Sequence, residues 1–536
     1  MIGNKKLNIK ATGLIAVAVM CSRLLGLIRE VVFNDLFGAA SMGIFLIAFR
    51  APNLLRDLFA EGVLSIAFIT IFSKKLENDG ENSAWQLASK MITLTSVFMC
   101  AVSILGIIYA KKMIIILAPG FSAEDASTTI LLIQIMYPFI LLVSLAALVM
   151  GILNSKNVFG IPALASSFFN IGSIVGGCLC GWLIDPGFGK NALIGLAIGT
   201  ILGGLFQLIV QIPSLKRVGF HFKLDFRWND PEIRNILILT VPGIIAASAV
   251  QINVLIGSIF SSYIGTEAVT WLNSAFRLVQ FPIGIFGVAV ATITLPVISR
   301  IAATKDHSQF GITLGKAMRF VVFLTLPVAV GFWLFSKEII SLIYEHGKFS
   351  AEDSAQTAFA MQFYALGLVA YSCIKVLSPA FYAIDRKWTP MFVSFGSVII
   401  SIMLNCFFIF VLKMGHEGLA LSTAIVATVN CIILYFLMAR SHNLETMNFI
   451  SNFIRCGVAS IALALTCWGS LTFFSDFIYS PSFFTRACSL FTTILFVSVI
   501  YISVCLILKV EGACSIARII LQKISPKPLI VESSSP

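Results

Sequence analysis

The sequence predicts an all-α polytopic membrane protein of about 14 transmembrane helices, arranged as two six-helix lobes in parallel repeat plus two C-terminal helices. Its composition, its long apolar runs and an internal repeat predict this class. Of the 536 residues, 58% are hydrophobic and only 12% are charged, whereas soluble chains carry roughly 25% charged residues. So few charged side chains cannot cover a soluble fold, which excludes disordered, fibrous and ordinary cytosolic enzyme classes.

The apolar runs indicate helices and not transmembrane β-strands. Strands of that kind alternate over about ten residues, whereas a spanning helix needs about 20 continuous apolar residues, as in the run 194–212. The predicted spans cover 11–36, 42–72, 85–110, 127–153, 158–184, 191–213, 234–263, 268–299, 312–344, 355–384, 389–412, 418–439, 450–475 and 484–508.

The N-terminus resembles a signal peptide, with Lys5, Lys6 and Lys10 ahead of an apolar stretch. It lacks a small-residue cleavage site, and the apolar stretch continues through Arg23 and Arg29, which favours an uncleaved first helix. With this end inside, most basic loop residues are cytoplasmic, which predicts cytoplasmic termini. The basic residues on that side are Lys74, Lys75, Lys156, Lys216, Arg217, Lys223, Arg227, Arg300, Lys305, Arg386, Lys387, Arg440, Lys509, Arg518 and Lys523. The opposite side holds Lys111, Lys112, Lys190, Lys348, Lys413 and Arg486.

The chain repeats itself at a spacing of 227–228 residues. The triplet AFR ends at Arg50 and at Arg277, the pentad FSAED covers 121–125 and 349–353, and Pro162 corresponds to Pro390. Three matches at nearly one spacing indicate a duplication. The offset contains six spans, an even number, so the copies share one orientation in the membrane.

The duplication sets the predicted domain organisation. It comprises an N-lobe over 1–213, a basic cytoplasmic linker over 214–233, a C-lobe over 234–440, two extra helices over 441–510 and a cytoplasmic tail over 511–536. The last part of that tail, from Ile524 onward, has a composition typical of disorder.

Nothing in the sequence indicates an enzyme, a metal site or a nucleic-acid interface. The five histidines fall in loops and never at i, i+4, and the 12 cysteines are scattered without paired CxxC spacing. No Walker loop, nucleophile elbow or HExxH motif occurs. The net charge of +12 lies in short loops, as expected for residues that fix topology, and does not form a basic soluble surface.

The first two spans break the rule that membrane helices avoid charge. An arginine at the bilayer centre costs roughly 2.5–3.5 kcal/mol, so four would cost about 10–14 kcal/mol. Such residues are tolerated when they face a hydrated cavity or one another. The intramembrane charges singled out are Arg23, Arg29, Glu30, Arg50, Arg56, Asp57, Glu61, Arg277 and Lys375.

Helical spacing places several of these charges on common faces. Arg23 and Glu30 are seven residues apart, and Arg50, Asp57 and Glu61 follow at i, i+7, i+11. Internal pairing that holds two helices together remains an alternative, above all for the two acids. For Arg56 and Lys375, snorkelling toward the interface is another. Because cations outnumber carboxylates, the set predicts an anionic ligand, and guanidinium groups bind phosphate oxygens in a bidentate manner.

Long motifs in the chain closely resemble the MurJ/MviN family of lipid II flippases, which belongs to the MOP exporter superfamily. The similar stretches lie between about residues 11 and 440 and are 22–39, 48–68, 137–154, 276–296, 375–383 and 389–390. The resemblance implies two six-helix lobes with two extra helices. It also implies cavity roles for Arg23, Arg29, Glu30, Arg50, Arg56, Glu61 and Arg277.

The chain departs from the family pattern at positions where relatives carry acids. Gly43 stands where an Asp is frequent, and Gly257, with Asn405 on the eleventh helix, stands where some members carry an acid for a coupling cation. The coupling ion therefore cannot be carried over. No cofactor is expected, and a coupling ion or the membrane potential remains open as the energy source.

The resemblance implies a flippase in the bacterial inner membrane that serves peptidoglycan synthesis and cell shape. Its substrate would be lipid II, an undecaprenyl-pyrophosphate-linked disaccharide-pentapeptide, moved by alternating access, with membrane lipids and cell-wall synthesis proteins as further expected partners. The alternatives are a MOP-type exporter of a drug or another polyprenyl-linked glycan, and a non-transporting scaffold for cell-wall assembly.

Overall fold

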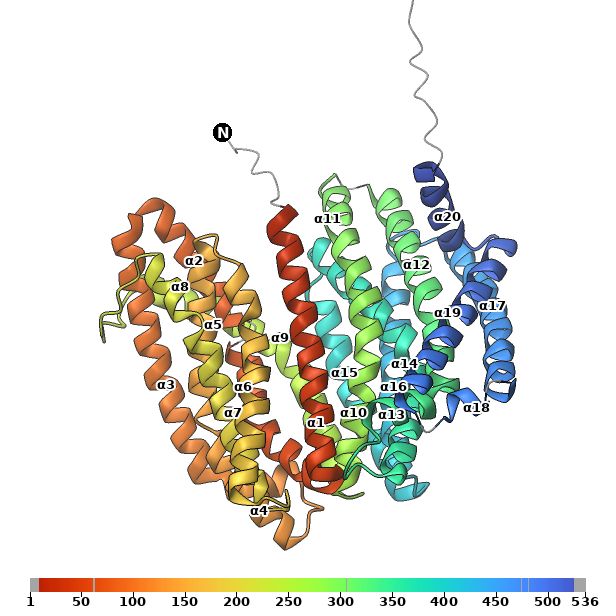
Figure 1. The fold of residues 1–536 in the computed structure, drawn as a ribbon. Helices are drawn as coiled ribbons and strands as arrows, with labels where there is room; N and C mark the ends of the chain where they lie inside the picture. Colours follow the sequence, from red (N-terminus) through yellow and green to blue (C-terminus); the bar gives the residue numbers. More distant parts are fainter. Residues whose placement is uncertain (1–8, 61–62, 305, 474, 481, 525–536) are drawn as a thin grey trace, which may run out of the picture. The chain divides into compact units, whose positions relative to one another are not determined.

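The computed structural model describes residues 9–60, 63–304, 306–473, 475–480 and 482–524. Within these ranges the chain is helical, with short connections and no strand. Twelve helices are long and apolar enough to span a membrane, and α9 adds a thirteenth if its two parts, which meet at 47°, form one span. The all-α membrane class is therefore confirmed (Figure 1).

A kink explains most of the difference from 14 predicted spans. The helix α1 (Ile9–Leu55) contains Gly38 at φ 73°, ψ 168°, which is not a helical conformation. A residue other than glycine rarely adopts this positive φ. The 42-residue candidate span Val17–Leu58 therefore holds the first predicted span and most of the second, joined at Gly38.

The helices pack into two compact units, each described here by itself. The first unit comprises Met1–Trp271 and Ile343–Ser354, and the second comprises Leu272–Leu342 and Ala355–Pro536. Packing defines these units, whereas duplication defines the predicted lobes, so the lobe boundaries stay a prediction. In the first unit lie α1, η1 (Arg56–Ala60), α2 (Val63–Asn78), α3 (Gly80–Leu117), α4 (Ala123–Met136), α5 (Phe139–Ser155), α6 (Gly160–Ile184), α7 (Ala192–Ile209), α8 (Ile212–Arg217) and α9 (Pro231–Ser262).

The remaining helices lie in the second unit or cross its boundaries. They are α10 (Thr266–Pro282), η2 (Ile283–Val288), α11 (Ala289–Ala303), α12 (His307–Leu334), α13 (Ser336–Tyr344), α14 (Ala351–Ala383), α15 (Trp388–Cys406), η3 (Phe407–Val411), α16 (His416–Ala439), α17 (Thr446–Phe473), α18 (Ser475–Ile478), α19 (Phe483–Ile507) and α20 (Glu511–Ile524). The described part of the predicted tail is thus helical, while the part predicted to be disordered lies, from residue 525, outside the described residues.

Glycines bring α6 and α7 of the first unit into direct backbone contact. Gly195, Gly199 and Gly203 recur every four residues along α7, and a Cβ at any of them would overlap backbone atoms of α6. Small residues at this spacing allow close approach of membrane helices, where lipid removes the hydrophobic driving force. The core of the unit also draws side chains from α1, α3, α4 and α7, including Phe33, Phe37, Met99, Ile133 and Leu196.

A short segment from later in the chain completes the first unit. The backbone N–H of Lys348 donates to the carbonyl oxygen of Asp35 at 2.8 Å, and its ammonium donates to the carbonyl oxygen of Phe188 at 2.9 Å. In addition, Nε1 of Trp271 donates to Oδ1 of Asp353 at 2.8 Å. Residues 343–354 therefore fold with parts of the chain that precede them by between 82 and 314 positions.

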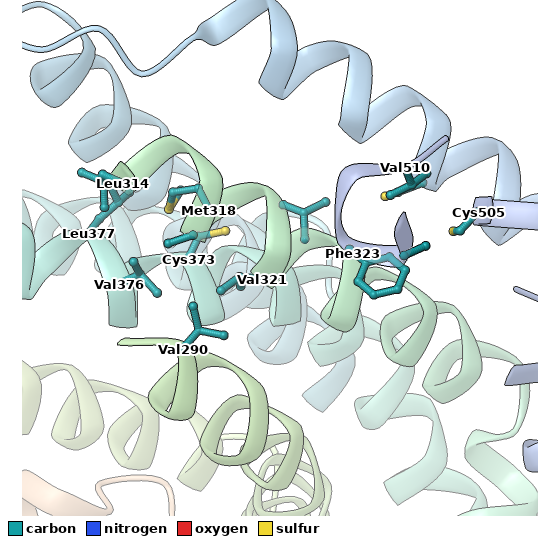
Figure 2. Close-up of a cluster of buried hydrophobic side chains, with 14 of the residues drawn as sticks. Val290, Leu314, Met318, Val321, Phe323, Cys373, Val376, Leu377, Cys505 and Val510 are labelled. Carbon is teal, nitrogen blue, oxygen red and sulfur yellow. The ribbon is translucent and has the colours of Figure 1, made fainter. Parts of the chain in front are cut away.

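The two helices predicted outside the repeat share the core of the second unit. Buried side chains of α11, α12, α14, α17 and α19 form one cluster, part of which Figure 2 shows around Val321 and Phe323. The Tyr501 ring of α19 stacks on Phe323 of α12, and its hydroxyl donates to the Phe323 carbonyl oxygen at 2.9 Å. These helices are therefore an integral part of this unit.

The duplicated pentad FSAED begins a helix in both copies. Ser122 caps α4 by accepting a hydrogen bond from the backbone N–H of Asp125, and Ser350 does the same for Asp353 ahead of α14, both at 3.1 Å. Acids in a first helical turn also interact favourably with the helix dipole. The same residues thus perform the same task at both positions, in keeping with the inferred duplication.

A buried ion triad ties three parts of the second unit together. The Arg319 side chain on α12 is 4% exposed, and its Nη2 lies 2.8 Å from Oε2 of Glu445, in the turn before α17. Its Nε lies 2.5 Å from Oε2 of Glu511, at the start of α20. Arg319 lies within a predicted span, yet sequence reasoning did not single it out.

Candidate functional site

The first half of α1 carries three of the predicted site residues with different environments. The Arg23 side chain is exposed, and Arg29 is half-buried with its guanidinium 5.1 Å from the ring centroid of Phe169 on α6. Glu30 is buried and accepts a hydrogen bond from the Tyr344 hydroxyl at 3.2 Å. Glu30 therefore contributes to the packing of the 343–354 segment, while the arginines lie at more accessible positions.

The second half of α1 and the π-helical turn η1 bring further charges against α9. Nε of Arg50 donates to Oγ of Ser258 at 3.1 Å. Nη2 of Arg56 lies 3.1 Å from Oδ1 of Asp57, and the other carboxylate oxygen accepts from Nε2 of Gln251 at 3.3 Å. Asn53 adds a further donor to that oxygen at 3.3 Å. Asp57 thus pairs internally, as the structural alternative in the sequence analysis expected for an intramembrane acid.

These contacts show that α9 runs antiparallel to the segment 50–57. Arg50 meets Ser258, and Asp57, seven residues later, meets Gln251, seven residues earlier. Seven residues make two helical turns, about 10 Å, so both pairs lie on one face of each helix. Sequence reasoning missed Gln251 and Ser258, and their i, i+7 spacing was a weak signal because α9 carries other polar residues, such as Ser248 and Asn253.

A π-helical turn follows each copy of the AFR triplet. The turn η1 begins at Arg56, six residues after Arg50, and η2 begins at Ile283, six residues after Arg277. The phenylalanine of each triplet packs on an aromatic ring of its own unit, Phe49 on Phe139 at 5.8 Å and Phe276 on Tyr364 at 5.1 Å. Isolated π turns occur frequently at functional sites. The duplication has therefore preserved a local distortion beside each arginine.

The remaining predicted residues lie elsewhere. Arg277 on α10 is half-buried and Lys375 on α14 is exposed, and both belong to the second unit. Glu61 lies outside the described residues. In the first unit the structure gathers Arg50, Arg56 and Asp57 against α9, with Arg23 and Arg29 further back along α1. Of the intramembrane charges singled out above and described in the first unit, the four arginines outnumber the carboxylates Glu30 and Asp57, which suits an anionic ligand.

The geometry can be compared with that of known proteins. A family model described as "Lipid II flippase MurJ" matches residues 33–490, most of the chain. The chain belongs to this family. A "Probable lipid II flippase MurJ" of Buchnera aphidicola subsp. Acyrthosiphon pisum is 34% identical over 426 residues, covering 78% of this chain and 82% of that protein. The counterpart from Rickettsia prowazekii is 32% identical, covering 93% and 97%.

Solved structures agree with this placement in the MurJ family. A structure titled "Lipid II flippase MurJ, inward closed conformation" superposes with a TM-score of 0.74 at 26% identity, covering 95% of this chain and 99% of that one. A multidrug resistance MATE transporter of the MOP superfamily has a TM-score of 0.67 at 15% identity, covering 80% and 97%. At that identity the likeness shows the fold alone, which is the fold the MurJ resemblance implied.

Gly43 and Gly257, the two glycines singled out in the sequence, differ in their surroundings. A Cβ at Gly43 on α1 would overlap the carbonyl oxygen of Thr266, at the start of α10. At Gly257 on α9 no atom lies within 4 Å of a Cβ. Gly43 is therefore required for close helix contact in this chain, whereas the position of Gly257 has room for a side chain.

We expect Gly43→Ala to lower the amount of protein in the membrane severely, because the added methyl group forces the two backbones apart. Gly257→Ala is the matched control, since it adds the same atom to another intramembrane helix where space exists. Quantitative immunoblots of membrane fractions measure both. Equal amounts of the two variants would contradict the assigned close contact.

Proposed function

We propose that this protein is a lipid II flippase, which moves the undecaprenyl-pyrophosphate-linked peptidoglycan precursor from the cytoplasmic to the outer leaflet of the inner membrane. The observation that carries the proposal is the set of arginines on membrane-spanning helices of a MurJ family member. Arg29, Arg50 and Arg56 lie on α1 and η1 with partly accessible side chains. Such residues in a membrane mark a ligand path.

The proposed chemistry is recognition without bond formation. Arg23 and Arg29 of the first unit, and separately Arg277 of the second, would each bind phosphate oxygens of the ligand, because the planar guanidinium fork matches two phosphate oxygens at once. Asp57 is a positioning residue in this proposal: it accepts from Arg56 and from Gln251 and so fixes the direction of the Arg56 guanidinium. Access to the ligand would alternate between the two sides of the membrane while the polyprenyl tail stays in lipid.

The proposal assigns no catalytic residue, resident cofactor or metal to the chain. A difference in affinity for the pyrophosphate between the two conformations does not by itself set the direction of transport. An energy source must also bias the equilibrium between these conformations. We propose a coupling ion or the membrane potential for that task. Lipid II and the surrounding membrane lipids are the proposed partners, together with cell-wall synthesis proteins.

Depletion of the protein in its native cell tests the function directly. Lipid II should accumulate on the cytoplasmic leaflet while protein synthesis continues, because polymerisation on the outer side loses its substrate. If outer-leaflet lipid II stays unchanged and cell-wall synthesis nevertheless stops, the scaffold alternative takes precedence. If a drug or another polyprenyl-linked glycan accumulates instead, the alternative of a different MOP-type exporter does so.

The proposed orientation, with both termini in the cytoplasm, makes a labelling prediction. Cysteines introduced at Gly187 and at Ser480 should react with a membrane-impermeant maleimide in intact cells, and one at Lys223 should react only after lysis. Gly187 and Lys223 are both exposed, so reactivity at these two reports the side of the membrane. Cys21, Cys100 and Cys488 are exposed and are replaced by serine in the background. External labelling at 223 would reverse the orientation.

A further inference from the structure

The linker between α8 and α9 is bound along the surface of α3. The backbone N–H of Lys223 donates to Oγ of Ser89 at 3.3 Å, and that of Asp225 donates to Oγ1 of Thr93 at 3.4 Å. Ser89 and Thr93 are one helical turn apart and buried. Residues 222–226 therefore follow α3 in an extended path, since alternate N–H groups reach successive turns of the helix, and a tight turn follows in which the N–H of Trp228 donates to the carbonyl oxygen of Phe226 at 2.9 Å.

Both ends of this segment are fixed to the same helix. The buried Phe220 packs edge-on against Trp85, with ring centroids 5.4 Å apart. At the other end Nζ of Lys90 lies 2.6 Å from Oδ2 of Asp230, which also caps α9 through the N–H of Glu232. Burial opposes the charge on Asp230, yet the hydrogen bond from Lys90 holds the pKa of that carboxyl below its usual range.

The outward face of the segment is apolar. Phe222, Leu224 and Phe226 are 51%, 66% and 58% exposed. Residues at i, i+2, i+4 of an extended chain point to one side, and the side chain of Asp225, which lies between Leu224 and Phe226, is by contrast only 11% exposed. These three large apolar side chains, at alternate positions, form an exposed apolar surface. Such a surface is unusual for a linker that lies in water.

The position along α3 indicates what covers this face. At 1.5 Å per residue the 38 residues of α3 extend about 57 Å, well beyond the roughly 30 Å of a hydrocarbon core. The exposed large apolar residues of α3 begin at Val97, one turn after Thr93, and continue with Phe98, Ile104, Leu105 and Ile108. The linker residues 220–228 therefore lie at the depth where α3 enters the lipid.

The charges around the apolar face suit the head groups at that depth. Lys216, Arg217, Lys223 and Arg227 are exposed, and Arg227 reaches outward with a side chain 79% exposed while pairing with Asp225 at 2.7 Å. Aromatic residues flanked by basic ones are typical of segments at the boundary between head groups and acyl chains. Anionic phospholipids attract such basic residues electrostatically.

We propose that residues 220–228 form an interfacial membrane anchor, in which Phe222, Leu224 and Phe226 insert among the phospholipids of one leaflet and the neighbouring basic residues contact their phosphates. The anchor attaches the start of α9 to α3 and to the bilayer surface. The linker between the two repeats is thereby held in a fixed position on the first unit. The occupant of the apolar face is phospholipid.

Photo-crosslinking in vesicles tests the proposal. The full chain, with p-benzoylphenylalanine at position 222, 224 or 226, is reconstituted in phosphatidylethanolamine and phosphatidylglycerol vesicles, irradiated, and analysed by intact-protein mass spectrometry. We expect phospholipid adducts at all three positions, with yields within about twofold of the probe at Val97 and at least about fivefold above the probe at Asn229. Asn229 is exposed and directly follows the segment 220–228, but it is not part of the apolar face.

Two results would overturn the anchor. One is a yield of lipid adduct at 222, 224 and 226 no higher than at 229, which would place the face in water. The other is a protein adduct in place of a lipid adduct when the same variants are irradiated in cells, which would make the occupant a protein. If one variant fails to reach the membrane, the probe is placed at another of the three positions, because each position tests the proposal independently.

Discussion

Alanine in place of Arg29 or of Arg277 is expected to abolish support of growth, while the amount of protein in the membrane stays near that of the wild type. One contact of Arg29 is a cation–π interaction with Phe169, 5.1 Å from the ring centroid. An arginine that faces water and substrate contributes little to folding, whereas a structural arginine leaves a buried acid unpaired when it is removed. The loss of a pyrophosphate clamp would instead remove transport.

Arg29→Lys should be impaired as well. An ammonium keeps the positive charge but loses the planar fork that binds two phosphate oxygens. If Arg29 only attracts anions electrostatically, the lysine variant should work as well as the wild type. If Arg29 is structural, protein amount and function should fall together.

Growth complementation, membrane protein amount and lipid II binding distinguish these outcomes for the three variants. Arg440→Ala is the matched control, because it also removes a guanidinium from an aromatic ring, that of Phe436, at 4.4 Å. It lies in the turn after α16, away from the predicted site residues in sequence. Normal growth and normal lipid II binding by Arg29→Ala would refute the pyrophosphate-clamp assignment.

Arg319→Leu is expected to give the opposite pattern, a large loss of thermal stability. Removing one member of a buried ion pair costs about 3–5 kcal/mol because the partner charge stays behind. Glu445 and Glu511 are 25% and 44% exposed, so partial hydration reduces that cost toward its lower end. We expect a fall of several degrees in the unfolding temperature of purified protein, with a matching fall in membrane amount.

The combined variant Arg319→Leu/Glu445→Gln/Glu511→Gln supplies the control. It leaves no unpaired charge at the triad, so it should recover most of the lost stability. Thermal unfolding in detergent of the single and combined variants measures this difference. A single variant that is as stable as the wild type but cannot transport would move Arg319 from the framework into the transport machinery.

The sequence predicted best those features that depend on residues close together along the chain. Runs of apolar residues set the helices, and the pentads 121–125 and 349–353 set two helix starts, because a serine cap and its acids act within one turn. The arginines on α1 could also be identified from the sequence, because a charged residue within an apolar run is energetically costly and therefore rare. Their roles in binding remain predictions.

The features that escaped prediction depend on distant partners. Ser258 and Gln251 are uncharged, so hydropathy gave no reason to connect them with Arg50 and Asp57, about two hundred residues earlier. Arg319 meets carboxylates 126 and 192 residues away, Glu445 in a turn and Glu511 at a helix start, where acidic residues are common at the surface. The close approach at Gly43 likewise depends on where Thr266 lies, which no local pattern encodes.

The first unit is built from segments that are far apart in the sequence, and this limits where the chain can be cut into two fragments. A cut within 214–233 follows the sequence duplication, yet it separates α9 from α2 and α3, against which α9 packs, and leaves 343–354 on the other fragment. The N-terminal fragment would lack α9 and residues 343–354 of the first unit, whereas the C-terminal fragment would hold every segment of the second unit. Coexpressed halves should therefore restore the first unit by fragment complementation, with the C-terminal fragment supplying the segments that the N-terminal fragment lacks. The two copies of this duplicated chain therefore cannot be separated at the duplication boundary unless the first unit reassembles from the two fragments.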